Sequence, residues 1–202
     1  MSRIGVLGGA FNPPHIGHLL LAQEAAATLG LERVLLVPTG VAPHKRIEPE
    51  PGAELRLAMT RLAAAADPLL EASPLEVERE GPSFAYRTLE LLTDERPGSE
   101  LTFVMGADVA AGFAGWRRPE RVLELARIAV AARPGADRDA AHNVLAGLGA
   151  GVETIEMPPV GISSSLLRAR VARRLPIRWM VPDPVAELIA ERALYTSRGD
   201  AP

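Results

Sequence analysis

The chain has 202 residues, of which 48% are hydrophobic and 23% charged, as in an ordinary globular protein that buries a substantial core. Its formal net charge of −3 argues against a bulk nucleic-acid binder, because such proteins carry an excess of cations. Cysteine is absent, which excludes disulfides, thiol nucleophiles and zinc–thiolate sites. No apolar run approaches the roughly 20 residues that span a bilayer, and the N-terminus is unlike a signal peptide. We therefore expect a cytoplasmic protein without membrane contact.

Strand-like and helix-like patterns alternate along the chain. Gly30 is expected to cap the first helix, Ser83 to be the N-cap of the third, and a proline to occupy the first turn of the last. In chain order, the pattern predicts a strand over residues 3–9, a helix over 17–29, a strand over 32–40, a helix over 53–66, an extended segment over 69–80, a helix over 83–96, a strand over 101–106, a helix over 119–126, strands over 127–135 and 152–158, and helices over 163–175 and 182–194.

This alternation predicts an α/β fold, a Rossmann-like, doubly wound and mainly parallel sheet with helices on both faces. No repeat or domain boundary interrupts it, so we expect a single domain over residues 1–202 that includes the C-terminal helices at about 163–195. Ligands bind such sheets beyond the carboxyl ends of the strands. Several polar motifs follow strands at those ends.

The segment GGAFNPPHIGH, residues 8–18, contains the first motif. It matches neither the GxGxxG nor the GxxxxGK[ST] phosphate-binding pattern. Gly8 and Gly9 nevertheless allow backbone N–H groups to approach an anion, and the helix that follows directs its N-terminal N–H groups to the same place. His15 and His18 share one face of its first turn and can donate hydrogen bonds to phosphate oxygens. A turn with two solvated histidines and a metal-binding histidine pair are the alternatives, although no Asp or Glu lies close in sequence to complete a metal site.

This segment resembles the opening of bacterial nicotinate-mononucleotide adenylyltransferases, in the HIGH-type nucleotidyltransferase superfamily that also contains class I aminoacyl-tRNA synthetases. The resemblance continues in order over nearly the whole chain. Its further blocks are PTGVAPHK (38–45), GPSFAYRTL (81–89), FVMGADVAAGFAGW (103–116), VAARPG (130–135), ISSSLLRARV (162–171) and PDPVAELIAERALY (182–195).

The resemblance implies adenylyl transfer from ATP to nicotinate mononucleotide, which gives deamido-NAD and pyrophosphate. The attacking phosphate is already an anion, so alignment and charge neutralisation suffice without a general base. Mg²⁺ is expected to arrive mainly with ATP. By resemblance His15, His18, Lys45 and Arg168 are catalytic. ATP contacts are expected from Gly8, Gly9, Ala10, Phe11, His15, His18, His44, Lys45, Gly106, Asp108, Ile162, Ser163, Ser164, Ser165 and Arg168, and nicotinate-mononucleotide contacts from Phe84, Ala85, Trp116 and Arg133.

Each of these motifs also has a purely structural interpretation. The PHK loop around Lys45, the only lysine of the chain, could be an ordinary solvated loop. Ser163 or Ser164 could simply be a helix N-cap, as could Asp108, whose carboxylate by resemblance accepts from ribose hydroxyls. Trp116, which resembles the residue that stacks on the nicotinate ring, could be a core tryptophan.

Four positions depart from the family pattern, because Phe84-Ala85 stands where the family usually has Tyr-Thr, and Asn12 and Ser165 also differ. Asn12 replaces the commoner Asp, which a turn tolerates. Ser165 replaces a usual Thr, and ISSS is closer to phosphopantetheine adenylyltransferase, a sister family that lacks the PHK block and remains the alternative. Ala85 replaces a threonine whose hydroxyl helps to receive the nicotinate carboxylate. We therefore expect acid-over-amide discrimination to survive but to be weaker.

Two further functions stay open at this point. A non-catalytic nucleotide-binding protein would keep the fold, but the intact His15, His18, Lys45 and Arg168 speak against it. A tRNA-directed protein is disfavoured by the missing KMSKS-like block, by the short chain and by the negative net charge. The expected partners are therefore ATP and nicotinate mononucleotide, with no nucleic acid or membrane. The sequence does not decide whether the chain forms a homo-oligomer.

Overall fold

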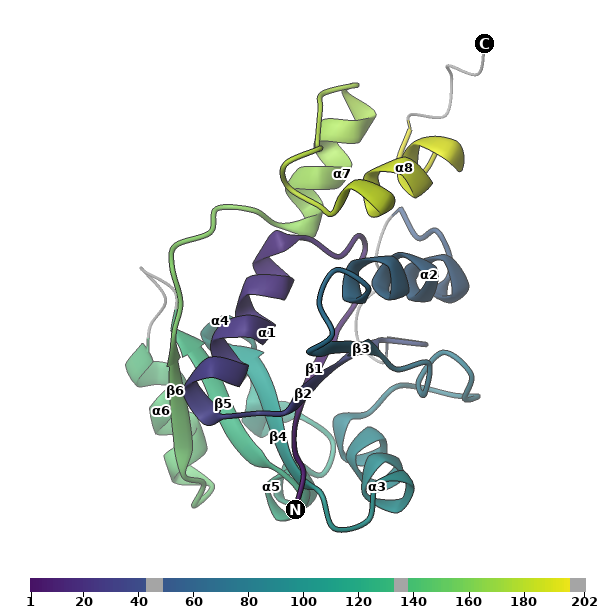
Figure 1. The fold of residues 1–202 in the computed structure, drawn as a ribbon. Helices are drawn as coiled ribbons and strands as arrows, with labels where there is room; N and C mark the ends of the chain where they lie inside the picture. Colours follow the sequence, from purple (N-terminus) through teal and green to yellow (C-terminus); the bar gives the residue numbers. More distant parts are fainter. Residues whose placement is uncertain (43–48, 133–137, 197–202) are drawn as a thin grey trace.

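The fold is described from a computed structural model, which places residues 1–42, 49–132 and 138–196 (Figure 1). The strands of its central sheet are β1 (Arg3–Gly9), β2 (Arg33–Pro38), β3 (Leu70–Ala72), β4 (Glu100–Gly106), β5 (Arg127–Ala132) and β6 (Val152–Glu156). All five strand pairs are parallel, in the order β3-β2-β1-β4-β5-β6. This confirms the doubly wound sheet that the alternating pattern predicts.

Helices follow the strands and cover both faces of the sheet. They are α1 (Ile16–Leu29), α2 (Ala53–Ala64), α3 (Ala85–Glu95), α4 (Ala107–Ala110), a 3₁₀ turn over Phe113–Gly115, α5 (Pro119–Leu125), α6 (Arg138–Gly147), α7 (Ser164–Ala172) and α8 (Asp183–Glu191). The left-handed Gly30, with φ 60°, ends α1 as expected. Among the described residues, no helix combines the length and the apolar character that crossing a membrane requires.

Alternate residues of each strand contribute to two apolar layers, one on each face of the sheet, because successive side chains of a strand point to opposite faces. Leu35 and Val37 of β2 join the layer beneath α3, α5 and α6, together with Phe103 of β4. Leu36 of β2 and Val104 of β4 join the opposite layer, beneath α1. Burial on both faces explains why the strands read as continuous apolar runs.

A third apolar cluster joins the C-terminal helices to α2. Met59 of α2 packs with Leu167 of α7, with Val185 and Ile189 of α8, and with Tyr195. Figure 1 shows α7 and α8 together at the end of the sheet where α1 begins. The C-terminal segment therefore lies over the carboxyl ends of the strands.

Two sequence-based predictions were wrong in detail. The extended segment over 69–80 forms a strand only over Leu70–Ala72, and turns follow Pro74. Phe84, not Ser83, is the N-cap of α3, because the Ser83 hydroxyl accepts a hydrogen bond from the Gly40 backbone N–H at 3.0 Å. Helices α4 and α6 were not predicted.

Candidate active site

The candidate site lies where the strand order reverses. β1 pairs with β2 on one side and with β4 on the other, and the chain leaves each strand into a loop at its carboxyl end. Gly9 ends β1, Pro38 ends β2 and Gly106 ends β4. In doubly wound sheets, ligands usually bind beyond the strand ends at such a reversal.

The two histidines pack against each other at the start of α1. His15 is the N-cap residue and only 4% exposed, and its ring stacks on that of His18 with centroids 3.7 Å apart. The Nδ1 atom of His18 accepts the backbone N–H of His15 at 3.1 Å. The edge of the buried Phe11 ring closes the other side of His18. The neutral His18 ring therefore carries its proton on Nε2.

Gly17 leaves room for this stacking. A β-carbon at this position would lie 3.0 Å from Nδ1 and 3.1 Å from Cε1 of His15, closer than such contacts ordinarily are. The middle of the HIGH segment is thus small because the His15 ring occupies the space that a side chain would take.

Helix α7 is joined to the loop between β1 and α1. The Ser164 hydroxyl donates to the Pro13 carbonyl at 2.9 Å, and the Arg168 guanidinium donates to the Asn12 carbonyl at 2.8 Å. The same guanidinium donates to Ser165 Oγ at 3.1 Å. Ser163 is the N-cap, because its hydroxyl accepts the Leu166 N–H. The serines and Arg168 therefore lie beside the histidine segment, and half-buried Ile162 packs on the cluster of C-terminal helices.

Asn12 connects three parts of the chain. Its Oδ1 accepts the buried Tyr195 hydroxyl at 2.5 Å, and its Nδ2 donates to the Pro49 carbonyl at 3.0 Å. Burial raises the pKa of Tyr195, and the nearby Arg168 offsets this only in part, so the hydroxyl keeps its proton and remains a donor. The amide of Asn12 provides both the acceptor and the donor that these partners need.

Arg56 of α2 is a buried cation that the sequence analysis did not single out. It is 2% exposed, and its Nη1 donates to the carbonyls of Ala10 at 3.0 Å and Thr39 at 2.6 Å. Its Nη2 donates to the Gly40 carbonyl at 3.1 Å, and its Nε pairs with Glu50 at 2.8 Å. Its spacing from the buried Met59, Thr60 and Ala63 places it on the buried face of the helix, which is the signal that could have found it.

The loop after β2 is held tightly against the segment before α3. A β-carbon on Gly40 would lie 2.0 Å from the Glu76 carbonyl oxygen, so only glycine fits there. The Glu76 carboxylate is buried and accepts the Thr88 hydroxyl of α3 at 2.5 Å. Together with the Ser83–Gly40 bond, these contacts fix the start of α3 relative to the end of β2.

The residues that the resemblance assigns to nicotinate mononucleotide follow this junction. Phe84 and Ala85 are half-buried at the start of α3, and the Arg117 guanidinium lies over the Phe84 ring, 5.1 Å from its centroid. Trp116 is half-buried against Phe103 of β4 and Phe113. The tryptophan thus packs on the core and still keeps an accessible part.

The remaining expected residues are distributed as follows. Gly8 is exposed, and Gly9 and Ala10 are half-buried at the end of β1. Gly106 is the N-cap of α4, and Asp108 is exposed in the first turn of that helix, beyond β4, the strand next to β1. His44, Lys45 and Arg133 lie outside the described residues.

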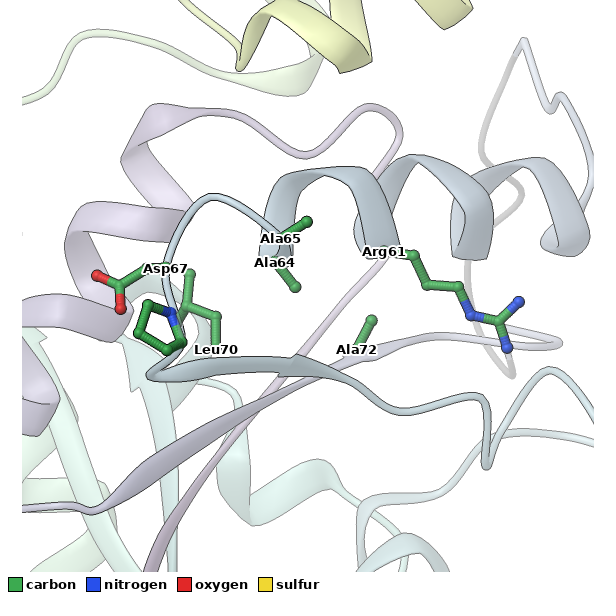
Figure 2. Close-up of a pocket in the computed structure, with 7 residues that line it drawn as sticks. Arg61, Ala64, Ala65, Asp67, Leu70 and Ala72 are labelled. Carbon is green, nitrogen blue, oxygen red and sulfur yellow. The ribbon is translucent and has the colours of Figure 1, made fainter.

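A shallow pocket of about 410 Å³ lies away from this site, between α2 and the edge strand β3 (Figure 2). It is lined by Arg61, Ala64, Ala65, Asp67, Pro68, Leu70 and Ala72, none of which belongs to the predicted site. The candidate site is therefore defined by the convergence of the polar motifs at the strand ends.

Comparison with known proteins places this geometry in a family. Residues 6–170 match the cytidylyltransferase-like family model. A "Probable nicotinate-nucleotide adenylyltransferase" of Symbiobacterium thermophilum is 41% identical over 205 residues, covering 100% of this chain and 98% of that protein. The protein of the same name from Roseiflexus sp. (strain RS-1) is 45% identical over 195 residues, covering 95% and 97% of the two chains.

A solved structure shares the fold at lower identity. The Plasmodium falciparum nicotinic acid mononucleotide adenylyltransferase complexed with APC superposes with a TM-score of 0.78 at 16% identity, covering 96% of this chain and 98% of that one. The same enzyme complexed with NaAD gives the same TM-score. The chain therefore belongs to the cytidylyltransferase-like family and, within it, to the nicotinate-nucleotide adenylyltransferases.

Proposed function

We propose that this chain transfers the adenylyl group of ATP to nicotinate mononucleotide, giving deamido-NAD and pyrophosphate in NAD biosynthesis. The observation that carries the proposal is the direct bonding of α7 to the histidine segment at the reversal of the strand order, through Ser164–Pro13 and Arg168–Asn12. These bonds bring the N-terminal turn of α7 and Arg168 next to the segment that precedes α1 and carries the histidines. Such an arrangement suits an anion with several phosphates.

The reaction requires alignment more than proton transfer. A phosphate oxygen of the mononucleotide forms a bond to the α-phosphorus of ATP as the bond to the pyrophosphate oxygen breaks, and the leaving pyrophosphate takes the electron pair. Near neutral pH the attacking group is already an anion, so no base is needed. The protein has to neutralise the charge that builds up on the α-phosphate and on the leaving group.

We assign that neutralisation to the residues of the histidine segment and α7. His18 donates from Nε2, the ring nitrogen that carries the proton when Nδ1 accepts the His15 backbone N–H, and His15 acts beside it. Removal of one such donor lowers the rate by about 10²–10³. Gly8, Gly9, Ala10 and Phe11 provide the backbone approach to the phosphates. Ile162–Ser165 and Arg168 act on them from α7, and His44 and Lys45 are assigned there by resemblance.

The acceptor nucleotide is assigned to the neighbouring half of the site. Phe84 and Ala85 receive the pyridine carboxylate, the accessible part of Trp116 stacks on the ring, and Arg133 meets the nucleotide phosphate. Gly106 and Asp108, at the end of β4, are assigned to ATP, where the Asp108 carboxylate accepts from the ribose hydroxyls. The tight junction between Gly40 and the segment before α3 supports this division, because it fixes the two halves relative to each other.

Mg²⁺ would enter this site as the partner of the ATP phosphates. The residues described in the structure contain no group of three or more His, Cys, Asp or Glu side chains placed to hold a metal ion. This fits an ion whose ligands are mainly phosphate oxygens and water, the coordination that Mg²⁺ favours with nucleotide substrates. Bound there, it would share the neutralisation of the leaving group.

The test is pyrophosphate release by the purified protein with Mg·ATP. Nicotinate mononucleotide, nicotinamide mononucleotide and phosphopantetheine are offered in parallel, and ATP binding is measured by calorimetry. We expect turnover to be fastest with the nicotinate compound. Turnover with phosphopantetheine alone would show that the chain is a phosphopantetheine adenylyltransferase. ATP binding without turnover of any acceptor would show that it is a nucleotide-binding protein without this activity.

A further inference from the structure

We propose that Arg117 determines acceptor specificity in this chain, by binding the pyridine carboxylate whose usual hydroxyl partner is missing at Ala85. This inference rests on the proposed function, because it assumes that the acceptor lies at Phe84, Ala85 and Trp116. It differs from the expectation that the loss of the hydroxyl simply weakens the preference for the acid.

The position of the Arg117 guanidinium is the first support. Its Cζ atom lies 5.1 Å from the centroid of the Phe84 ring, and Phe84 immediately precedes Ala85. A guanidinium that lies over an aromatic ring keeps its N–H edge directed outward, where it can bind a carboxylate with two parallel hydrogen bonds. The cation is therefore held beside the residue that lacks the hydroxyl.

The second support is that Arg117 is not committed elsewhere. Its side chain is exposed, and none of the carboxylates whose side chains the structure describes forms an ion pair with it. Nearby Arg121, by contrast, pairs with both Glu90 and Glu124. A substrate carboxylate would thus pair with Arg117 without displacing a carboxylate of the protein.

The third support is the neighbouring tryptophan. Trp116 packs edge-on against Phe103, with ring centroids 5.7 Å apart, and against Phe113 at 4.9 Å. These contacts fix the indole to the end of β4, and Arg117 is the next residue. A pyridine ring stacked on this indole would therefore present its substituent close to the guanidinium.

The chemistry of the two acceptors gives the expected size of the effect. Nicotinate mononucleotide carries a carboxylate, whereas nicotinamide mononucleotide carries a neutral amide of the same shape. A guanidinium forms charge-assisted hydrogen bonds only with the carboxylate, and these are about twice as strong as neutral ones. We expect Arg117 to favour the acid by about tenfold in kcat/KM.

The chain offers a matched control. The Arg118 guanidinium lies 5.2 Å from the centroid of the ring of Tyr86, the residue after Ala85. This contact is equivalent in kind, but Arg118 is one residue farther along the chain from Trp116. The centroids of the Phe84 and Tyr86 rings lie 6.0 Å apart and the rings are nearly parallel. Each of the two arginines therefore contacts one ring of a stacked pair. Substituting either removes the same type of contact.

The experiment measures kcat/KM for both acceptors, together with KM for ATP, in the wild type, Arg117→Ala, Arg117→Lys and Arg118→Ala. Arg117→Ala should lower the acid-to-amide ratio about tenfold and leave the KM for ATP unchanged. The lysine variant should retain part of the ratio, and Arg118→Ala should retain all of it. An unchanged ratio in Arg117→Ala, or an equal fall in Arg118→Ala, would overturn the inference.

A second comparison tests whether Arg117 replaces the missing hydroxyl. Ala85→Thr restores it, so in that background Arg117→Ala should lower the ratio by clearly less than tenfold. If Arg117→Ala lowers the acid-to-amide ratio equally in both backgrounds, Arg117 does not replace the missing hydroxyl. If the wild type does not turn over nicotinate mononucleotide at all, the proposed function fails. If the wild type is active and substitution of Arg117 leaves the acid-to-amide ratio unchanged, only the present inference fails.

Discussion

His15 and His18 are organised by each other before any substrate binds. The stacked rings and the bond from the His15 N–H to the His18 Nδ1 fix which ring nitrogen of His18 can donate. Gly17 leaves the room that this arrangement needs. In the function that we propose, the two histidines therefore lose little conformational freedom on binding ATP, which favours in-line transfer.

This arrangement allows the structural and chemical roles of His18 to be separated. An asparagine can accept the His15 N–H in place of Nδ1 but reaches no farther, whereas a glutamine places an amide donor near the Nε2 position. We expect His18→Asn to retain the melting temperature of the wild type while kcat falls about 10²–10³-fold. His18→Gln should retain more of the rate. Full activity of His18→Asn in the pyrophosphate assay would contradict the donor role.

At the scale of elements, α2 contributes to the site through a single buried cation. Arg56 binds the Ala10 carbonyl after β1 and the Thr39 and Gly40 carbonyls after β2, so one side chain sets the spacing of two loops. Arg56 itself is buried, so its guanidinium needs these carbonyls and Glu50 as acceptors in place of water. The helix thereby holds the turn after β1 and the loop after β2 together.

Loss of this cation should destabilise the protein strongly. Arg56→Met removes the donors of three carbonyls and leaves the Glu50 carboxylate unpaired, so we expect the free energy of unfolding to fall by about 2–4 kcal/mol. Arg61→Met, on an exposed part of the same helix, should change it by less than about 0.5 kcal/mol. Urea unfolding measures both. Equal stabilities of the two variants would show that Arg56 is dispensable.

At the scale of the whole molecule, one carboxylate links the edge strand β3 to the neighbouring strand β2 and to the end of α3. Glu71 of β3 pairs with Arg33 of β2 at 2.7 Å and with Arg96, which follows α3, at 2.5 Å. Partial burial acts to raise the pKa of Glu71, but the hydrogen bonds and charges of the two arginines outweigh it and leave that pKa below its ordinary value. The short edge strand is thus bound to its neighbours in an acid-sensitive way.

The sign of the pH dependence follows from this lowered pKa. Glu71 contributes stability above the ordinary carboxyl pKa of about 4.3, and the contribution is lost as the pH falls through the lower folded-state pKa. Glu71→Gln should therefore be less stable than the wild type at pH 7, by about 1 kcal/mol or less, and equally stable near pH 2. Urea unfolding at both pH values, with the exposed Glu95→Gln as control, measures this. A gap that persists in acid would contradict the role of the charge.

The sequence predicts what depends on local pattern. Apolar runs predict the strands, Gly30 marks the end of α1, and Ser163 caps α7 as expected. Ser83 failed as a cap because its hydroxyl is taken by the Gly40 N–H, which the fold brings to it from far along the chain. The same reason hides the role of Arg56, whose partners lie in three separate segments.

Asn12 is the extreme case of such distance, because Arg168 and Tyr195 bond to it from the far end of the chain. During synthesis all six strands, which end at Glu156, leave the ribosome before either of these residues. A nascent chain can therefore complete its sheet while the loop that carries the histidines still lacks two of its anchors. The anchored form of this loop therefore requires residues that are synthesised only after the whole sheet.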